Sequence, residues 1–170
     1  MRKLCMSALL SLLLVSCGYH LAGHGDAGLI PTNSKQMVVV AAGGDQASLL
    51  PELKKALQQG LNLALVSREE VRKEAHDDTI EVRIEQSRES FVSSSFDASG
   101  IANQYRLTLS GMVRVWQAGK EIWVSEALSQ TGDVFATGDT VAIEAQKERV
   151  AESLRKAWAQ KIVGRLRSGF

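Results

Sequence analysis

The stretch Tyr105-Arg106-Leu107-Thr108-Leu109-Ser110-Gly111-Met112-Val113-Arg114-Val115 decides the fold, because apolar and polar side chains alternate along almost all of it. A period of two residues is typical of a β-strand with one face buried and the other in water. The turn sequence Ala118-Gly119-Lys120 comes next, and the apolar residues Ile122, Val124 and Leu128 then mark a return strand. The sequence therefore predicts an antiparallel hairpin over residues 104–130.

Two more strands are predicted upstream. Ile80, Val82 and Ile84 alternate with charged residues, which again indicates a half-buried strand. Residues 37–40 are an uninterrupted apolar run rich in β-branched side chains, as expected for an inner strand. The segment 93–100, polar and rich in small residues, is interpreted as a flexible hairpin tip.

Two helices complete the pattern. The first carries leucines at helical spacing between Leu50 and Leu61, with Pro51 in its first turn and Asp45 or Ser48 as its cap. Between this helix and the strand that begins near Ile80, residues 61–66 suit a short extended stretch. Residues 68–78 are expected to form a surface turn or a short helix. The second helix is long and amphipathic. Its apolar positions are Ile143, Val150, Leu154, Ala157, Trp158, Ile162 and Leu166.

The resulting order is strand, helix, three strands, helix. This order predicts an α+β fold, a two-layer sandwich with two helices packed on one face of a four-stranded mixed sheet. We expect one such domain over residues 35–168. Residues 17–34 are rich in glycine and small residues and are expected to form a tether and the loop that leads into the domain.

The amino terminus has the features of a bacterial lipoprotein signal. Arg2 and Lys3 precede an apolar run over residues 4–15, and Ser16-Cys17 follows it. The run is too short to span a bilayer comfortably, since a spanning helix needs about 20 apolar residues. We expect residues 1–16 to be removed and Cys17 to carry S-diacylglycerol and N-acyl groups. An ordinary secretory signal with a cysteine nearby is the alternative.

Charge and cysteine content narrow the possible functions. The 170-residue chain has 20 basic and 19 acidic residues, and loss of the signal leaves 154 residues with 18 basic ones. A net charge near minus one gives no reason to expect a nucleic-acid partner. Cys5 would be lost with the signal and Cys17 acylated, so no thiol would remain for a disulfide or a metal.

The chain resembles the LptE family of lipopolysaccharide-assembly lipoproteins. The resemblance rests on the opening Cys17-Gly18-Tyr19-His20-Leu21, on Asn103-Gln104-Tyr105 at the start of the third strand, and on the order of elements over residues 17–166. It implies a non-enzymatic protein on the periplasmic face of the outer membrane. It also implies a partner, the LptD barrel, which such a protein plugs and helps to assemble while lipopolysaccharide is placed in the outer leaflet.

Candidate contact residues for a glycolipid or a protein partner lie on the predicted sheet. Some relatives touch the acidic glycolipid with basic residues near a hairpin tip, but this chain has no Lys or Arg between Arg88 and Arg106. If lipopolysaccharide is bound, charge-assisted contacts from arginines in the strands are the better candidates. The tryptophans on either side of the hairpin turn are possible partner anchors or ordinary sheet packing. The candidates are Arg83, Arg88, Arg106, Arg114, Trp116 and Trp123.

Other functions have weaker support. His20, His24, His76 and the pair Asp77-Asp78 could suggest a metal or acid-base site, but they are interpreted as surface residues. The sequence lacks a Gly-x-Ser-x-Gly elbow and a phosphate-binding loop, so no catalytic residue, metal or cofactor is predicted. The main alternative is an accessory lipoprotein of another envelope transport complex, and a hydrolase comes third.

Overall fold

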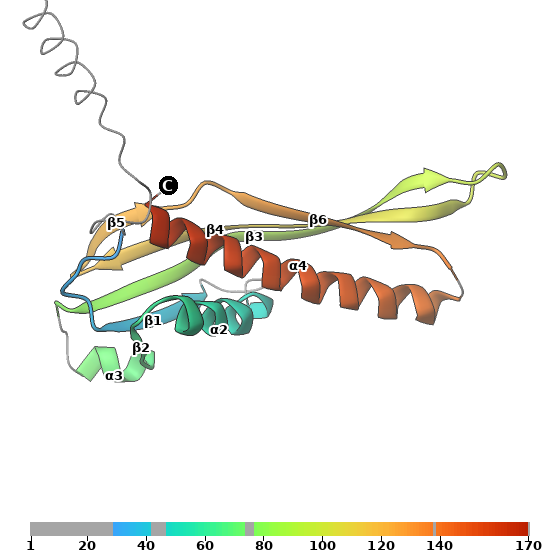
Figure 1. Ribbon diagram of the computed structural model, residues 1–170. Helices are drawn as coiled ribbons and strands as arrows, with labels where there is room; N and C mark the ends of the chain where they lie inside the picture. The colour runs from blue at the N-terminus through green and yellow to red at the C-terminus, as the bar shows by residue number, and fades with distance from the viewer. Residues whose placement is uncertain (1–28, 42–46, 74–76, 138, 170) are drawn as a thin grey trace, which may run out of the picture.

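The computed structural model describes residues 29–41, 47–73, 77–137 and 139–169. The predicted signal peptide, Cys17 and most of the tether lie outside the described residues. Strands and helices in the described part are arranged as an elongated body with a long hairpin projecting from one end (Figure 1). In chain order they are β1 (Gln36–Ala41), α2 (Leu50–Gly60), β2 (Ala64–Leu65), α3 (Arg68–Lys73), β3 (Thr79–Phe96), β4 (Ala102–Gln117), β5 (Lys120–Val124), β6 (Leu128–Phe135) and α4 (Thr140–Ser168).

All the described strands belong to one mixed sheet. The order across it is β2-β1-β3-β4-β5, and β6 also pairs with β4. β1 runs parallel to β2 and β3, whereas β4 runs antiparallel to β3, β5 and β6. The α+β class is confirmed, but the four-stranded description is wrong, because the sheet has six strands and α3 adds a third helix.

The predicted return strand is in fact two strands on the same edge of β4. β5 pairs with residues 114–117 of β4, and β6 pairs with residues 104–111. At the break, the Ser125 backbone N–H donates to the Val113 carbonyl at 2.8 Å, and the Ser125 hydroxyl accepts the Val113 N–H at 2.8 Å. The Ser125 hydroxyl takes the place of the backbone carbonyl that would accept the Val113 N–H in a regular strand pair. The alternation of polar and apolar residues does not reveal such a substitution.

A bulge in β3 changes which residues face the helices. The pairing with β4 shifts between Glu85 and Arg88, and Gln86 has a positive φ of 52°. Before the bulge the even-numbered residues of β3 face the helices, as Ile84 does. After it, and as far as Ser93, the odd-numbered ones do, as Phe91 does. β1 pairs only with residues 79–84 of β3, so the distal half of the β3–β4 hairpin continues past β1 with β6 beside it, and its tip projects from the body.

α2 and α4 both pack on one face of the sheet and form the core with it (Figure 1). Trp158 of α4 is fully buried, and its indole N–H donates to the Leu128 carbonyl at 3.2 Å. The ring lies directly over Gly111, where an added Cβ would come within 2.9 Å of it. Trp158, one of the apolar positions of the predicted amphipathic helix, is therefore a core residue.

Two local predictions need correction. The N-cap of α2 is Leu49, without a side-chain cap, rather than Ser48, while Asp45 lies outside the described residues. Pro51 does occupy the first turn, as predicted. The segment 93–100 is not a loop throughout, because β3 continues to Phe96 and only residues 97–101 form the turn. Aromatic and β-branched side chains within the serine-rich stretch keep it in the sheet.

Candidate interaction surface

The sheet face opposite α2 and α4, which we call the open face, carries five of the six candidate contact residues. The strand registers place them in rows: Arg83 is opposite Arg114, Trp116 is opposite Glu81, Arg88 is opposite Ser110, and Arg106 is opposite Val92. Trp123 is the exception, because it is opposite buried Val115 and packs against the core. The two tryptophans near the hairpin turn therefore lie on different faces.

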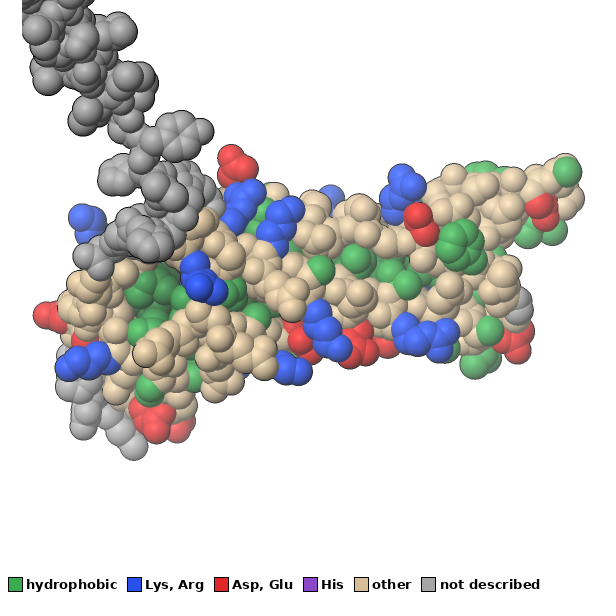
Figure 2. Space-filling model, in the orientation of Figure 1, with side chains coloured by type: hydrophobic (Ala, Val, Ile, Leu, Met, Phe, Trp, Pro, Cys, Tyr) green, Lys and Arg blue, Asp and Glu red, His purple; other side chains and the backbone are tan. Residues whose placement is uncertain are grey.

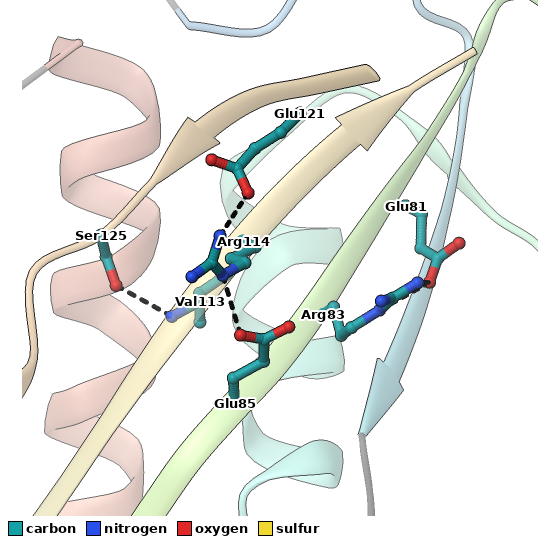
Figure 3. Close-up of polar contacts among 7 residues, drawn as sticks. All are labelled: Glu81, Arg83, Glu85, Val113, Arg114, Glu121 and Ser125. Atoms are coloured by element: carbon teal, nitrogen blue, oxygen red, sulfur yellow. Dashed lines mark hydrogen bonds and ion pairs between the residues drawn. The ribbon is translucent and has the colours of Figure 1, made fainter. Parts of the chain in front are cut away.

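Arg114 is held between two carboxylates from the neighbouring strands. Its Nε donates to Glu85 Oε2 at 2.8 Å and its Nη1 donates to Glu121 Oε2 at 2.5 Å (Figure 3). The hydrogen bond to Glu121, followed by that to Glu85, raises the pKa of Arg114 above its ordinary value. The charge of Arg114 is therefore balanced within the sheet, where it stabilises the pairing of three strands.

Arg83 is also engaged by neighbours. Its guanidinium forms an ion pair of 2.7 Å with Glu81 and lies 5.6 Å from the centre of the Trp116 ring. The same Trp116 borders a hollow of about 470 Å³ that Val38 and Val71 line from β1 and α3. The sequence identified the arginines but missed the glutamates, although Glu81, Glu85 and Glu121 occupy the outward positions of the alternation.

The distal part of the open face has a different character. Arg106 makes only a long ion pair of 3.4 Å with Asp133, and within the described residues the Arg88 side chain has no ion-pair partner. Val92, Phe96 and Phe135 are about half exposed or more, at 54%, 59% and 50%. Register places Val92 and Phe135 on the open face, opposite Arg106 and Gln104, while Phe96 is opposite Ala102 near the hairpin tip, after a further register shift. Large apolar side chains grouped on a projecting surface mark interaction sites.

Sequence reasoning missed Val92 because the bulge reverses the side-chain alternation before it. Phe96 was missed because residues 93–100 were interpreted as a hairpin tip, and Phe135 lies beyond the predicted hairpin. A signal was present, since Phe91, Val92 and Phe96 are strand-forming residues within a serine-rich segment. On the helix-covered face, Phe91 stacks on Tyr105 with ring centres 4.8 Å apart, and the Lys147 ammonium lies over the Phe91 ring. Phe91 therefore joins the hairpin to α4, while Val92 is free to contact a partner.

At the end of the hairpin, Asp97 organises the turn. Its carboxylate accepts hydrogen bonds from the Ser99 hydroxyl at 2.7 Å and from the Ser99 and Ile101 backbone N–H groups at 2.9 Å each. These bonds, that of the Ser99 hydroxyl first, lower the pKa of Asp97. Gly100 supplies the positive φ of 82° that closes the turn. The tip is thus an ordered acidic turn.

Neither a metal centre nor a membrane-spanning helix is found in the part of the chain that the structure describes. No group of three or more His, Cys, Asp or Glu side chains there is placed to hold a metal ion. His20, His24 and His76 lie outside the described residues. Within the same residues, no helix combines the length and apolar character needed to cross a bilayer.

Comparison with known proteins gives a family and several structures of the same fold. The family model described as LptE, lipopolysaccharide-assembly, matches residues 35–166. An uncharacterized lipoprotein B from Nitrosomonas europaea is 17% identical with a TM-score of 0.60, covering 86% of this chain and 88% of that chain.

Two further structures agree. Rare lipoprotein B from Shewanella oneidensis is 16% identical, with a TM-score of 0.56 over 78% of this chain and 90% of that one. A minor lipoprotein from Acinetobacter baumannii is 16% identical, with a TM-score of 0.58 over 79% and 92%. At these identities the likeness shows the fold. No curated protein matches the sequence.

Proposed function

This chain belongs to the LptE lipopolysaccharide-assembly family, and from that premise we propose that it is a lipid-anchored partner of the outer-membrane barrel LptD. In this proposal Cys17 is acylated and the domain lies on the periplasmic side of the outer membrane. The domain enters the barrel as a plug, supports assembly of the barrel, and assists insertion of lipopolysaccharide into the outer leaflet. The role is structural rather than catalytic, as expected for this family.

The open face is the observation that carries the proposal. It is rich in charged and hydroxyl groups, and two of its arginines are already neutralised by carboxylates of the same sheet. Burying an unpaired charge against a partner is costly, whereas a charge with its counter-charge in place can be covered at lower cost. The interior of an outer-membrane barrel is polar, so it suits a face of this composition.

The first experiment is co-purification. The full chain, tagged at its carboxyl terminus, is extracted from outer membranes in detergent, and we expect LptD to be recovered with it. Depletion of the chain should reduce the folded barrel and the surface-exposed lipopolysaccharide. If depletion leaves both at normal levels, the assembly role is wrong.

A pair of variants locates the contact. Thr108→Arg adds a long cation to the centre of the open face, between the positions of Arg88 and Arg106. We expect it to lower recovery of LptD. Ala145→Arg adds the same charge to an exposed position of α4 and should leave recovery unchanged. Equal recovery with both variants would show that the open face is not the contact.

Lipidation is tested separately by mass spectrometry of the mature amino terminus. We expect a thioether-linked diacylglycerol and an amide-linked acyl chain on Cys17, and Cys17→Ala should accumulate as the unprocessed precursor. An unmodified sulfur at this position would contradict the anchored topology.

A further inference from the structure

One end of the molecule combines the start of the described chain with a cluster of basic residues. The Leu29 backbone N–H donates to the Leu166 carbonyl at 3.3 Å, so the amino-terminal segment reaches the domain beside the last turn of α4. Cys17 precedes Leu29 by twelve residues, which span at most about 40 Å when fully extended. The proposed anchor on Cys17 therefore holds this end of the molecule within that distance of the lipid.

The charge of α4 is distributed unevenly. After Glu152 the chain contains no acidic residue, while its basic residues are Arg155, Lys156, Lys161, Arg165 and Arg167. The first two of these pair with glutamates on the same helix. Lys161 and Arg167 are exposed and have no ion-pair partner among the described residues, and Arg165 lies 3.9 Å from the largely exposed Glu126. Basic side chains gather at this end, next to the start of the described chain (Figure 2).

Apolar and aromatic groups lie beside these cations. Trp123, Val124 and Arg165 line a shallow hollow of about 410 Å³ with Ser125 and Glu126. Val124 is 42% exposed, and Trp123 is half-buried. Tryptophan next to lysine and arginine is the combination that favours the headgroup region of a bilayer, where the ring is partly buried and the cations meet phosphate.

We propose that this end, formed by Lys161, Arg165 and Arg167 with Trp123 and Val124, is a membrane-facing surface that binds anionic phospholipid headgroups. The proposal rests on the proposed lipidation of Cys17, and it adds a second membrane contact to the lipid anchor. One basic side chain close to an anionic surface changes binding by about fivefold. The surface would hold the domain against the leaflet that carries the anchor and fix the direction in which the hairpin points.

The test uses the full, lipidated chain in lipid vesicles. Gly164 is exposed among these cations, with open space where a Cβ would be, so Gly164→Cys accepts an environment-sensitive fluorophore without disturbing the fold. We expect a blue shift and a gain in emission on phosphatidylcholine vesicles that contain phosphatidylglycerol, but not on phosphatidylcholine alone. High salt should remove the difference. The same label at Ser94→Cys, in the projecting hairpin, should report water on both vesicles.

Matched charge variants make the result specific. In the labelled chain, Lys161→Gln with Arg167→Gln should shift the equilibrium about 25-fold toward the detached state and abolish the signal. Lys55→Gln with Arg149→Gln removes the same charge from exposed positions elsewhere and should keep it. Protein that washes off both vesicle types would contradict lipidation, and hence the proposed function. Protein that stays anchored with identical emission on both would overturn only the membrane-facing surface.

Discussion

At the scale of single residues, packing across the core depends on a glycine, Gly111, which leaves room for the Trp158 ring. Alternation along β4 places Gly111 on the buried face, but nothing in the sequence indicates that the Trp158 ring covers it. The pairing joins residues 47 positions apart in the chain. It follows from the crossing of α4 over the sheet, which a local pattern does not describe. Sequence reasoning could therefore place each residue in the core without identifying its partner.

We predict that Gly111→Ala destabilises the protein by about 1–3 kcal/mol, the usual cost of overpacking a core. The added Cβ would lie 2.9 Å from Trp158 Cζ2 and 3.3 Å from Cε2, and the ring is fixed by its hydrogen bond to Leu128. Urea unfolding followed by tryptophan fluorescence measures the change. Gly164→Ala is the control, because its Cβ enters open space on α4 and should stabilise by about 0.5–1 kcal/mol. Equal stabilities for the two variants would refute the contact.

Asp97 gives a prediction about pH. Because folding lowers its pKa, the turn gains stability above the ordinary aspartate value of about 4 and loses it as pH falls through the lower, folded value. We expect the amide signals of Ser99 and Ile101 to move together in an NMR titration over this acid range. Asp97→Asn should remove the transition while leaving core amides such as that of Leu107 in place. Amide shifts that stay constant in the unmodified chain would contradict the turn geometry.

At the scale of elements, the strands were predictable and their interruptions were not. Alternation located β3 and β4 because each buries one face along much of its length. The bulge near Gln86 depends on backbone conformation, and the break at Ser125 depends on one hydroxyl group. Neither feature changes the composition of the sequence around it. For this reason the predicted return strand joined β5 to β6, and Phe96 was assigned to a loop.

The break between β5 and β6 can be tested at Ser125, which is 3% exposed. Ser125→Ala removes the acceptor of the Val113 N–H and leaves that donor buried, at a cost of about 1–3 kcal/mol. Chemical denaturation should show this loss. Ser129→Ala, at an exposed position of β6, should remain within about 0.5 kcal/mol of the unmodified protein. A Ser125 variant as stable as the Ser129 variant would mean that the hydroxyl does not replace the ladder bond.

At the scale of the whole molecule, the fold class, the helix-covered face and most of the open-face cations followed from sequence, whereas the separation of the molecule into a body and a projection did not. That separation arises because β1 and α2 cover only the proximal half of β3. The core reaches along β4 to Leu107, and the part of the hairpin beyond it displays exposed side chains. We therefore expect the projecting tip of the hairpin to add little to stability.

The projection can be shortened to test this separation. None of residues 94–104 is buried, and Ser93 pairs with Tyr105 at the base of the segment. Replacing residues 94–104 with Asn-Gly closes the hairpin with a two-residue turn while keeping the Phe91–Tyr105 stack. Because the core is untouched, we expect the urea midpoint to change little. The deletion also removes Phe96 and Ile101, whose side chains are 59% and 66% exposed. We therefore expect recovery of LptD to fall.

A matched full-length control separates the tip side chains from the length of the hairpin. Phe96→Ser with Ile101→Ser keeps the length of the hairpin and removes only the apolar surface, so it should lower LptD recovery in the same direction as the deletion. If the double variant binds normally and the deletion does not, the barrel contacts the backbone of the extended hairpin and not its apolar side chains. If both bind normally, the proximal open face alone carries the interaction. A large loss of stability in the deletion would show that the projection belongs to the folding core, contrary to its exposure.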